Sequence, residues 1–162
     1  MGNAETGQAW TESAGNINIA SGKAVWASGT PAYCKVSHGI SSGDYWVSVE
    51  VTLPPAGFAG IIVGANSGTG HYNAIVAKSD GVLEYHTYTG LLTSFDTGLL
   101  VETGDVIQGR IASTGQCDVY VNGVYTGSGF AMGARVYDDC GLYFSGSSGS
   151  PTLDEFIVRR PG

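Results

Sequence analysis

Apolar and polar residues alternate over most of this chain, in short runs separated by Gly, Ser, Asn and Pro. Such alternation is typical of β-strands, because successive side chains of a strand point to opposite faces of the sheet. The clearest run is Tyr45–Leu53, in which every odd position from 47 to 53 is Val or Leu and the even positions are polar or Trp. Pro54 and Pro55 end this run, since proline has no N–H to donate to a neighbouring strand.

The same pattern predicts a succession of further short strands. Phe58–Ala65 is almost entirely apolar or Gly, which is typical of a strand buried on both faces. Glu84 and His86 share the polar face of another run, residues 82–89. The remaining predicted strands are a hairpin at 16–26 about the turn Ser21–Lys23, and the runs 32–37, 71–78, 91–96, 139–145 and 153–159.

A three-stranded meander is predicted between Gly104 and Thr126. In its first two runs the odd positions from 107 to 121 are apolar or small outside the turn Ser113–Gly115, and most even positions are polar. Asn122-Gly123 then gives a strong hairpin signal, because both residues tolerate a positive φ. The meander therefore has one dry side, and its other side carries Gln108, Arg110, Asp118 and Tyr120.

Composition favours an all-β fold. The 26 glycines have no collagen-like period, and 43% hydrophobic against 13% charged residues suits a sandwich with tight turns. The best helix candidate, Phe130–Val136, is short and contains Gly133. We predict a single two-sheet antiparallel jelly-roll sandwich over residues 1–162, with its core at roughly 10–158.

The charge of the chain excludes two classes of partner. A net charge of −7 and a pI near 4.6 provide no basic patch for nucleic acid or for an anionic membrane. The sequence also shows neither a signal peptide nor a run that predicts membrane insertion. We therefore expect no nucleic-acid partner and no membrane insertion.

No cofactor is predicted. Cys34, Cys117 and Cys140 have no close spacing, and Cys117 alternates with valines as a buried small hydrophobe would. One bridge among the three cysteines stays an open alternative. The histidines His38, His71 and His86 are too scattered for zinc, whereas the adjacent acids Asp138–Asp139 and Asp154–Glu155 keep a structural calcium ion as the exception.

The order of motifs resembles a known fold family. Trp10 follows a Gly-rich start, and after it come SVEVTL, a glycine-rich apolar strand, HYNAIVAKSDGVLEYH, GDVIQGRIASTGQCDVYVNGV, GLYFSG and LDEFIV. Together they resemble concanavalin A-like lectin/glucanase domains, the laminin-G-like jelly rolls, and more closely the versions found in bacteriophage virion proteins and bacterial surface proteins. The similarity covers about Trp10 to Val158.

The resemblance implies a sandwich located on a virion surface or outside a cell. It implies either glycan binding and adhesion or a purely structural role, and the fold alone does not choose between them. Such versions begin with a further short strand that carries an Asp-Phe pair. That strand is expected here to be missing, replaced or supplied by a neighbour, which would leave a sheet edge open for homo-oligomer formation.

Catalysis is not expected. Glucanases of this fold carry Glu-x-Asp-x-Glu on one strand, and hydrolysis with retention needs two carboxylates about 5 Å apart. Here Glu50 stands between Ser48 and Thr52, and Glu84 is followed by His86. There is also no Gly-x-Ser-x-Gly nucleophile motif. A glycan hydrolase with an atypical site stays the second alternative.

The polar face is the candidate ligand site. Sugars are bound by aromatic rings flanked by amide, carboxylate and guanidinium groups, which satisfy paired hydroxyls. The predicted ligand-binding residues are Trp46, Asn73, Glu84, His86, Gln108, Arg110, Asp118 and Tyr120, with Glu50 beside Trp46 if their strand lies in the same sheet. The alternative is a solvated face on which Arg110 pairs with Glu84 or Asp118.

These observations lead to one hypothesis and its rival. We expect a non-catalytic module that binds a host-surface glycan or polysaccharide, displayed on a phage virion together with other virion proteins. The rival is a structural capsid or tail decoration protein without a glycan ligand.

Overall fold

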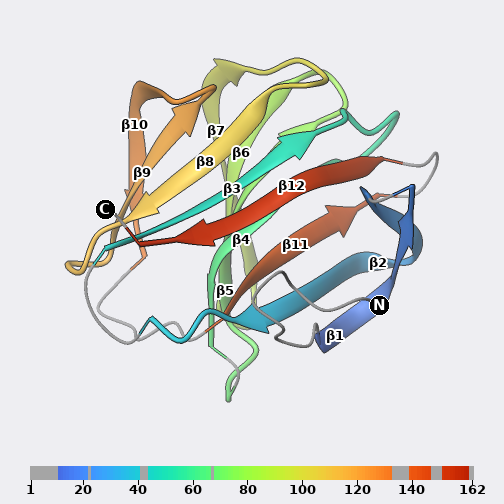
Figure 1. The fold of residues 1–162 in the computed structure, drawn as a ribbon, viewed down its shortest axis with the longest axis horizontal. Helices are drawn as coiled ribbons and strands as arrows, with labels where there is room; N and C mark the ends of the chain where they lie inside the picture. Colours follow the sequence, from blue (N-terminus) through green and yellow to red (C-terminus); the bar gives the residue numbers. More distant parts are fainter. Residues whose placement is uncertain are drawn as a thin grey trace.

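The computed structural model describes residues 11–21, 23–40, 44–66, 68–132, 139–146 and 151–160. Over these residues it consists of strands and turns, without a helix (Figure 1). The strands are β1 (Thr11–Ala20), β2 (Lys23–Ser37), β3 (Tyr45–Val51), β4 (Phe58–Ala65), β5 (Tyr72–Lys78), β6 (Val82–Tyr88), β7 (Leu92–Leu100), β8 (Val106–Ile111), β9 (Gln116–Val121), β10 (Val124–Ala131), β11 (Asp139–Ser145) and β12 (Thr152–Arg159). The predicted all-β class is confirmed.

The strands form two layers that share β2. The front sheet has the order β10-β9-β8-β3-β12, and the back sheet has the order β2-β11-β4-β5-β6-β7. The start of β2 pairs with β12 through Ala24 and Val25, whereas its end pairs with β11 from Ala32 to Ser37. β2 therefore passes from one sheet to the other, and β1 runs antiparallel beside it (Figure 1).

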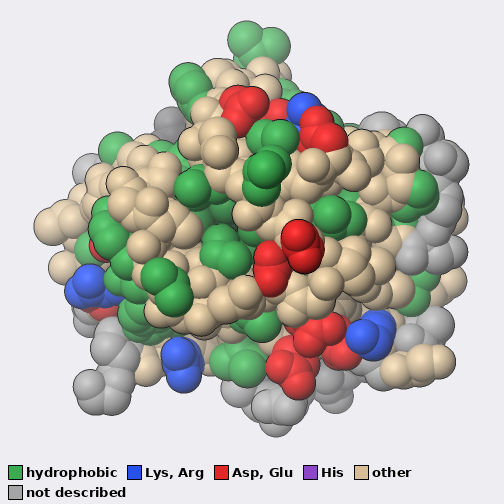
Figure 2. All heavy atoms as spheres, turned by 90° about the horizontal axis from the view of Figure 1, so that it is seen from above, with side chains coloured by type: hydrophobic (Ala, Val, Ile, Leu, Met, Phe, Trp, Pro, Cys, Tyr) green, Lys and Arg blue, Asp and Glu red, His purple; other side chains and the backbone are tan. Residues whose placement is uncertain are grey.

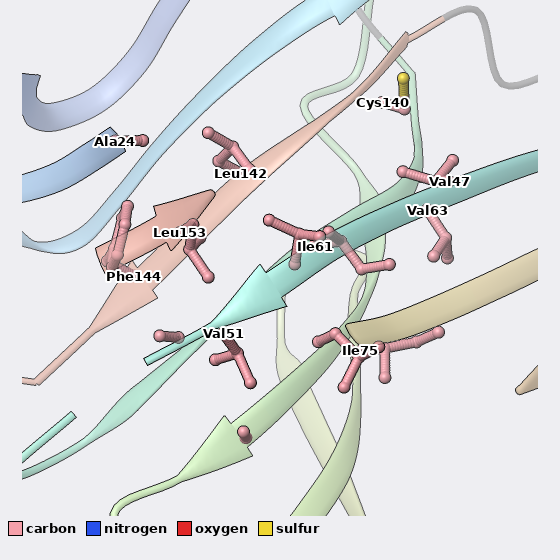
Figure 3. Close-up of a cluster of buried hydrophobic side chains, with 14 of the residues drawn as sticks. Ala24, Val47, Val51, Ile61, Val63, Ile75, Cys140, Leu142, Phe144 and Leu153 are labelled. Atoms are coloured by element: carbon pink, nitrogen blue, oxygen red, sulfur yellow. The ribbon is translucent and has the colours of Figure 1, made fainter. Parts of the chain in front are cut away.

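The inward side chains of both sheets meet in one apolar core. Val47, Val49 and Val51 of β3 are fully buried, as are Ile61 of β4 and Ile75 of β5. Figure 3 shows side chains of β3, β4, β5, β11 and β12 pointing toward one another between the layers. Burial of this apolar surface is the main term that holds the two sheets together.

Two contacts show how closely the sheets approach. The buried Tyr45 hydroxyl of β3 donates a hydrogen bond of 2.8 Å to the Val63 carbonyl of β4. A Cβ on Gly109 of β8 would come within 2.7 Å of Val63 Cγ1 and 3.1 Å of Ile75 Cδ1. Glycine at position 109 is thus required by the close packing between the sheets, because a larger side chain would overfill this part of the core.

Most predicted strands are found within one or two residues of their expected ends. The meander is β8, β9 and β10, and Asn122 has the positive φ of 52° that its hairpin turn requires. The largest difference concerns β2, which is continuous across the two runs expected to be separate strands. The helix candidate begins inside β10, and its residues 133–136 lie outside the described part of the chain.

The structure also bears on the three cysteines and on membrane insertion. Cys34, Cys117 and Cys140 are buried and form no disulfide, and burial raises the pKa of Cys117 and Cys140 far above the ordinary thiol value. They pack as small hydrophobes. Across the described ranges, no apolar helix has the length needed to cross a membrane.

Candidate functional site

On the outer face of the front sheet, the pairing register of β3, β8 and β9 determines which side chains are neighbours. Trp46 of β3 lies opposite Arg110 of β8, and Arg110 lies opposite Asp118 of β9. In the next row Gln108 of β8 lies opposite Tyr120 of β9. These side chains alternate with buried ones, so they point away from the core. Five of the predicted residues therefore share one face; that they bind a ligand stays a prediction.

Aromatic rings form a continuous row across this face. The ring of Tyr120 lies 4.8 Å from that of Trp46 and 5.3 Å from that of Tyr125, measured between centroids. At the other end of the row, the guanidinium carbon of Arg159 lies 5.9 Å from the centroid of the Trp46 ring. Trp46 is thus enclosed between Tyr120 and Arg159, and Tyr125, which is 52% exposed, is the member of the row most open to a ligand.

Arg110 is held in place by two carboxylates beside the aromatic row. Its Nη2 donates to Asp44 Oδ2 at 2.7 Å, and its Nη1 lies 3.8 Å from Asp118 Oδ2. Asp44 also accepts a hydrogen bond of 3.1 Å from the Ser113 backbone N–H. Asp118, at 3.8 Å, is too far for a hydrogen bond to Arg110, so its oxygens are less committed than those of Asp44.

A second charged group lies on the same face. Lys23 Nζ is 3.0 Å from Asp154 and 3.8 Å from Glu50, which lies on β3 two positions beyond Ser48. Glu50 and Asp154 are register partners on β3 and β12, so Lys23 joins two carboxylates that would otherwise repel. β3 pairs with β8 of the meander, so the condition for placing Trp46 and Glu50 in the same sheet as Arg110 is met.

Two acids of this face, Asp44 and Asp154, are stabilised in their ionised form. The Arg110 guanidinium and the Ser113 N–H lower the pKa of Asp44 below its ordinary value, and Lys23 lowers the pKa of Asp154. The same pairing raises the pKa of Arg110 and of Lys23. A general acid in glycoside hydrolysis needs the opposite change, a raised carboxyl pKa, so these two pairs are suited to holding charge and hydrogen bonds.

Three predicted residues lie elsewhere, in the back sheet. The prediction that Asn73 faces outward is wrong: Asn73 is opposite Thr87, shares its side of β5 with the core residue Ile75, and is 3% exposed. Its Oδ1 accepts a hydrogen bond of 3.0 Å from the Thr87 hydroxyl. The sequence misplaced it because no strong apolar alternation marks the first residues of β5.

Glu84 and His86 do share the outward side of β6, but of the back sheet and not of the front sheet. Their prediction as part of the common face is therefore wrong, and so is the pairing of Arg110 with Glu84. His86 is 1% exposed and its Nε2 lies 3.1 Å from Glu84 Oε2, while Lys78 Nζ lies 3.6 Å from the other carboxylate oxygen. Burial lowers the pKa of His86 despite the nearby carboxylate.

Sequence reasoning missed Tyr125, Asp44 and Arg159. Tyr125 could have been found, because the two-residue turn at Asn122-Gly123 places it opposite Tyr120 on the same face. Asp44 and Arg159 lie next to a strand start and at a strand end, where alternation carries little information.

The described residues include no group of three or more His, Cys, Asp or Glu side chains that could hold a metal ion. Of the two acid pairs considered for calcium, Asp138 lies outside the described residues, and Asp139 lies 3.7 Å from Lys35. Asp154 is bound by Lys23 and also accepts a hydrogen bond from the Glu155 N–H.

Comparison with known proteins places the fold. No family model matches the sequence, and no curated protein matches it. Among solved structures, the carbohydrate-binding module CBM66 from Bacillus subtilis is similar with a TM-score of 0.66 at 7% identity, covering 92% of this chain and 94% of that chain. A sialidase gives a TM-score of 0.64 at 10% identity over 93% of this chain, but only 17% of the sialidase chain is covered.

A third similar structure comes from work on the ganglioside-dependent cell entry of botulinum neurotoxin type C. It has a TM-score of 0.56 at 9% identity, covering 95% of this chain and 43% of the toxin chain. At such low identities the likeness establishes the fold alone. The chain is a concanavalin A-like jelly-roll sandwich, and its fold is one that carbohydrate-binding modules and toxin binding domains also use.

Proposed function

We propose that this chain binds glycans, without catalysis, through the outer face of its front sheet. The observation that carries the proposal is the aromatic row of Trp46, Tyr120 and Tyr125, bordered by the amide of Gln108 and the carboxylate of Asp118. Rings offer a flat apolar surface to the C–H face of a sugar, and the planar polar groups satisfy its hydroxyls. The similar carbohydrate-binding module and toxin domain support the same class of ligand.

The absence of catalysis is part of the proposal. Asp44 and Asp154 have lowered pKa values because each is paired with a cation, and neither suits the role of a general acid. We further propose display at a surface, such as that of a phage virion, on the strength of the sequence resemblance alone.

Titration calorimetry with neutral gluco-, manno- and galacto-oligosaccharides tests the binding. Tyr125→Ala is expected to weaken the affinity about tenfold, because it removes the most open ring of the row, and truncation of an aromatic anchor in a binding site commonly costs more than about 1 kcal/mol. Phe95→Ala is the matched control: Phe95 is 59% exposed but lies on β7 of the back sheet, and the variant should bind like the wild type.

No heat of binding with any of these sugars at millimolar concentration would overturn the proposal. Equal weakening by Tyr125→Ala and Phe95→Ala would mean that the face is wrongly assigned. A reducing-end assay on the same oligosaccharides tests the second part, and release of new reducing ends would show that the chain is an enzyme.

A structural decoration protein is the second candidate, and the edge strands favour it. β7 ends the back sheet and has no Lys or Pro among its residues, while Phe95 and Leu100 are 59% and 72% exposed. Viewed from above, hydrophobic side chains are scattered among polar side chains and small clusters of Asp and Glu (Figure 2). An unprotected edge of this kind invites pairing with another chain. Analytical ultracentrifugation would detect self-association, which Phe95→Lys should abolish.

A further inference from the structure

The cations on the outer face of the front sheet are already engaged. Lys23 lies between Asp154 and Glu50, and Arg110 lies between Asp44 and Asp118. Arg159, the other cation described on this face, lies against the Trp46 ring. A ligand carboxylate would have to compete with protein carboxylates for Lys23 and Arg110.

The acids on the same face outnumber these cations. Two carboxylates lie beside each of two cations, Glu50 and Asp154 beside Lys23 and Asp44 and Asp118 beside Arg110, and Arg159 lies against the Trp46 ring. The whole chain has a formal net charge of −7, which adds a repulsive field at longer range. An anionic ligand therefore meets like charge both at contact and during approach.

The side chains that remain available favour hydroxyl groups. Asp118 is 3.8 Å from Arg110, beyond hydrogen-bond distance, so its oxygens can accept from sugar hydroxyls. Gln108 lies in the row beside Tyr120 and can both donate and accept. Neutral sugars present alternating donors and acceptors of the kind that carboxylate and amide groups bind, with no added charge to compensate.

We propose that this face selects neutral glycans over glycans that carry carboxylates, with Asp118 as the specificity-determining acceptor. This inference rests on the proposed function, and it names the class of ligand. Asp118 disfavours an anionic sugar in two ways: it repels the charge, and at 3.8 Å from Arg110 it offsets part of the positive charge that such a sugar would seek.

The test uses pairs of ligands that differ only in charge. Neutral gluco-, manno- and galacto-oligosaccharides are compared with the same oligosaccharides after oxidation of their primary alcohols to carboxylates. At low ionic strength the oxidised form is expected to bind about tenfold more weakly than its neutral parent. The difference should shrink as salt is added, because screening shortens the range of the repulsion to about 8 Å at physiological ionic strength.

Asp118→Asn sharpens the test. It is expected to reduce the preference for the neutral form severalfold, since it removes one negative charge from the face and leaves the Asp44–Arg110 hydrogen bond in place. Asp96→Asn is the matched control: it changes the net charge equally, keeps an oxygen for the Gly98 N–H, and lies on the back sheet. It should leave the preference unchanged.

The outcomes separate this inference from the function on which it rests. Binding of oxidised oligosaccharides as tight as, or tighter than, binding of the neutral ones would overturn the selectivity and leave glycan binding intact. Equal effects of Asp118→Asn and Asp96→Asn would overturn the role of Asp118. No binding of either form would overturn both the selectivity and the proposed function.

Discussion

The outer faces of the two sheets differ in composition and in burial: β8 and β9 alternate between buried and partly exposed residues, whereas β4 and β5 are buried at nearly every position. On the front sheet the outward residues Gln108, Arg110, Asp118 and Tyr120 are all partly exposed. On the back sheet Ile62 and Val76 are fully buried, and Tyr143 is 1% exposed. The back sheet therefore carries a second apolar cluster outside the main core, while the front sheet carries a polar face.

Aromatic packing shows the same contrast. The Tyr72 ring lies 5.4 Å from that of Tyr88, with which it stacks, and 5.7 Å from that of Tyr143. Burial raises the pKa of Tyr72 far above the ordinary phenol value. On the front sheet the row ends instead at Tyr125, which is more than half exposed. An outward position in a sandwich thus determines the direction of a side chain but not its access to water, and of the described aromatic groups on the two outer faces, the row on the front face reaches further into solvent.

The largest expected effect is a difference in stability between tyrosines of the two faces. Tyr143→Ala should lower the free energy of unfolding by about 3–5 kcal/mol, because it leaves a cavity among Tyr72, Ile62 and Val76. Tyr120→Ala should cost only about 1 kcal/mol, since its ring is partly exposed and loses mainly ring contacts. Urea unfolding followed by circular dichroism measures both. Equal costs would mean that the two faces do not differ in burial.

The strand pattern of this fold could be predicted from sequence for a physical reason. Apolar side chains at alternate positions of β3, β8 and β9 are needed to fill one core. The buried positions, such as Val47 and Val119, can therefore be recognised from the alternation in the sequence. The extent of β2 could not be predicted, because a strand that passes between sheets changes neighbours along its length.

The candidate site was predictable only in part. Parity within the meander placed Gln108 and Arg110 on one face, because these residues are close in sequence and joined by short turns. Which sheet contains β5 and β6 depends on pairings between distant segments, so Glu84 and His86 were assigned to the wrong face. Asp44, the strongest partner of Arg110, is 66 residues away in sequence, and no local pattern indicates it.

The next effect is a pH dependence that originates in the back sheet. His86 is buried against Phe58 and Tyr143, and its pKa is lowered from the ordinary 6.5 because burial disfavours the charged ring. The unfolded chain therefore binds a proton at His86 more readily than the folded chain. The contribution of neutral His86 to the free energy of unfolding should be fully present above pH 6.5. It should be lost as the pH falls below 6.5 toward the lower pKa of the folded state.

His86→Gln isolates this effect. The variant should show a flatter dependence of unfolding free energy on pH just below 6.5, measured by urea titrations at several pH values. Gln can still donate to Glu84, so the comparison concerns the slope with pH and not the absolute stability. An unchanged slope would mean that the pKa of His86 is the same in the folded and unfolded chains, in contradiction to the lowering expected from its burial.

The smallest expected effect is the loss of a charge pair on the front sheet. Arg110 lowers the pKa of Asp44, so the pair stabilises the fold above the ordinary pKa of 3.8 and its contribution is lost as the pH falls below that value. Because both side chains are partly exposed and screened by salt, Asp44→Asn should change the urea midpoint at pH 7 only slightly. Glu84→Gln, which weakens the buried hydrogen bond to His86 and the charge contact with Lys78 on the back sheet, should lower it more. A larger decrease for Asp44→Asn than for Glu84→Gln would mean that the Asp44–Arg110 pair is a main support of the front sheet. The aromatic row beside it would then be part of the structural framework of the sandwich.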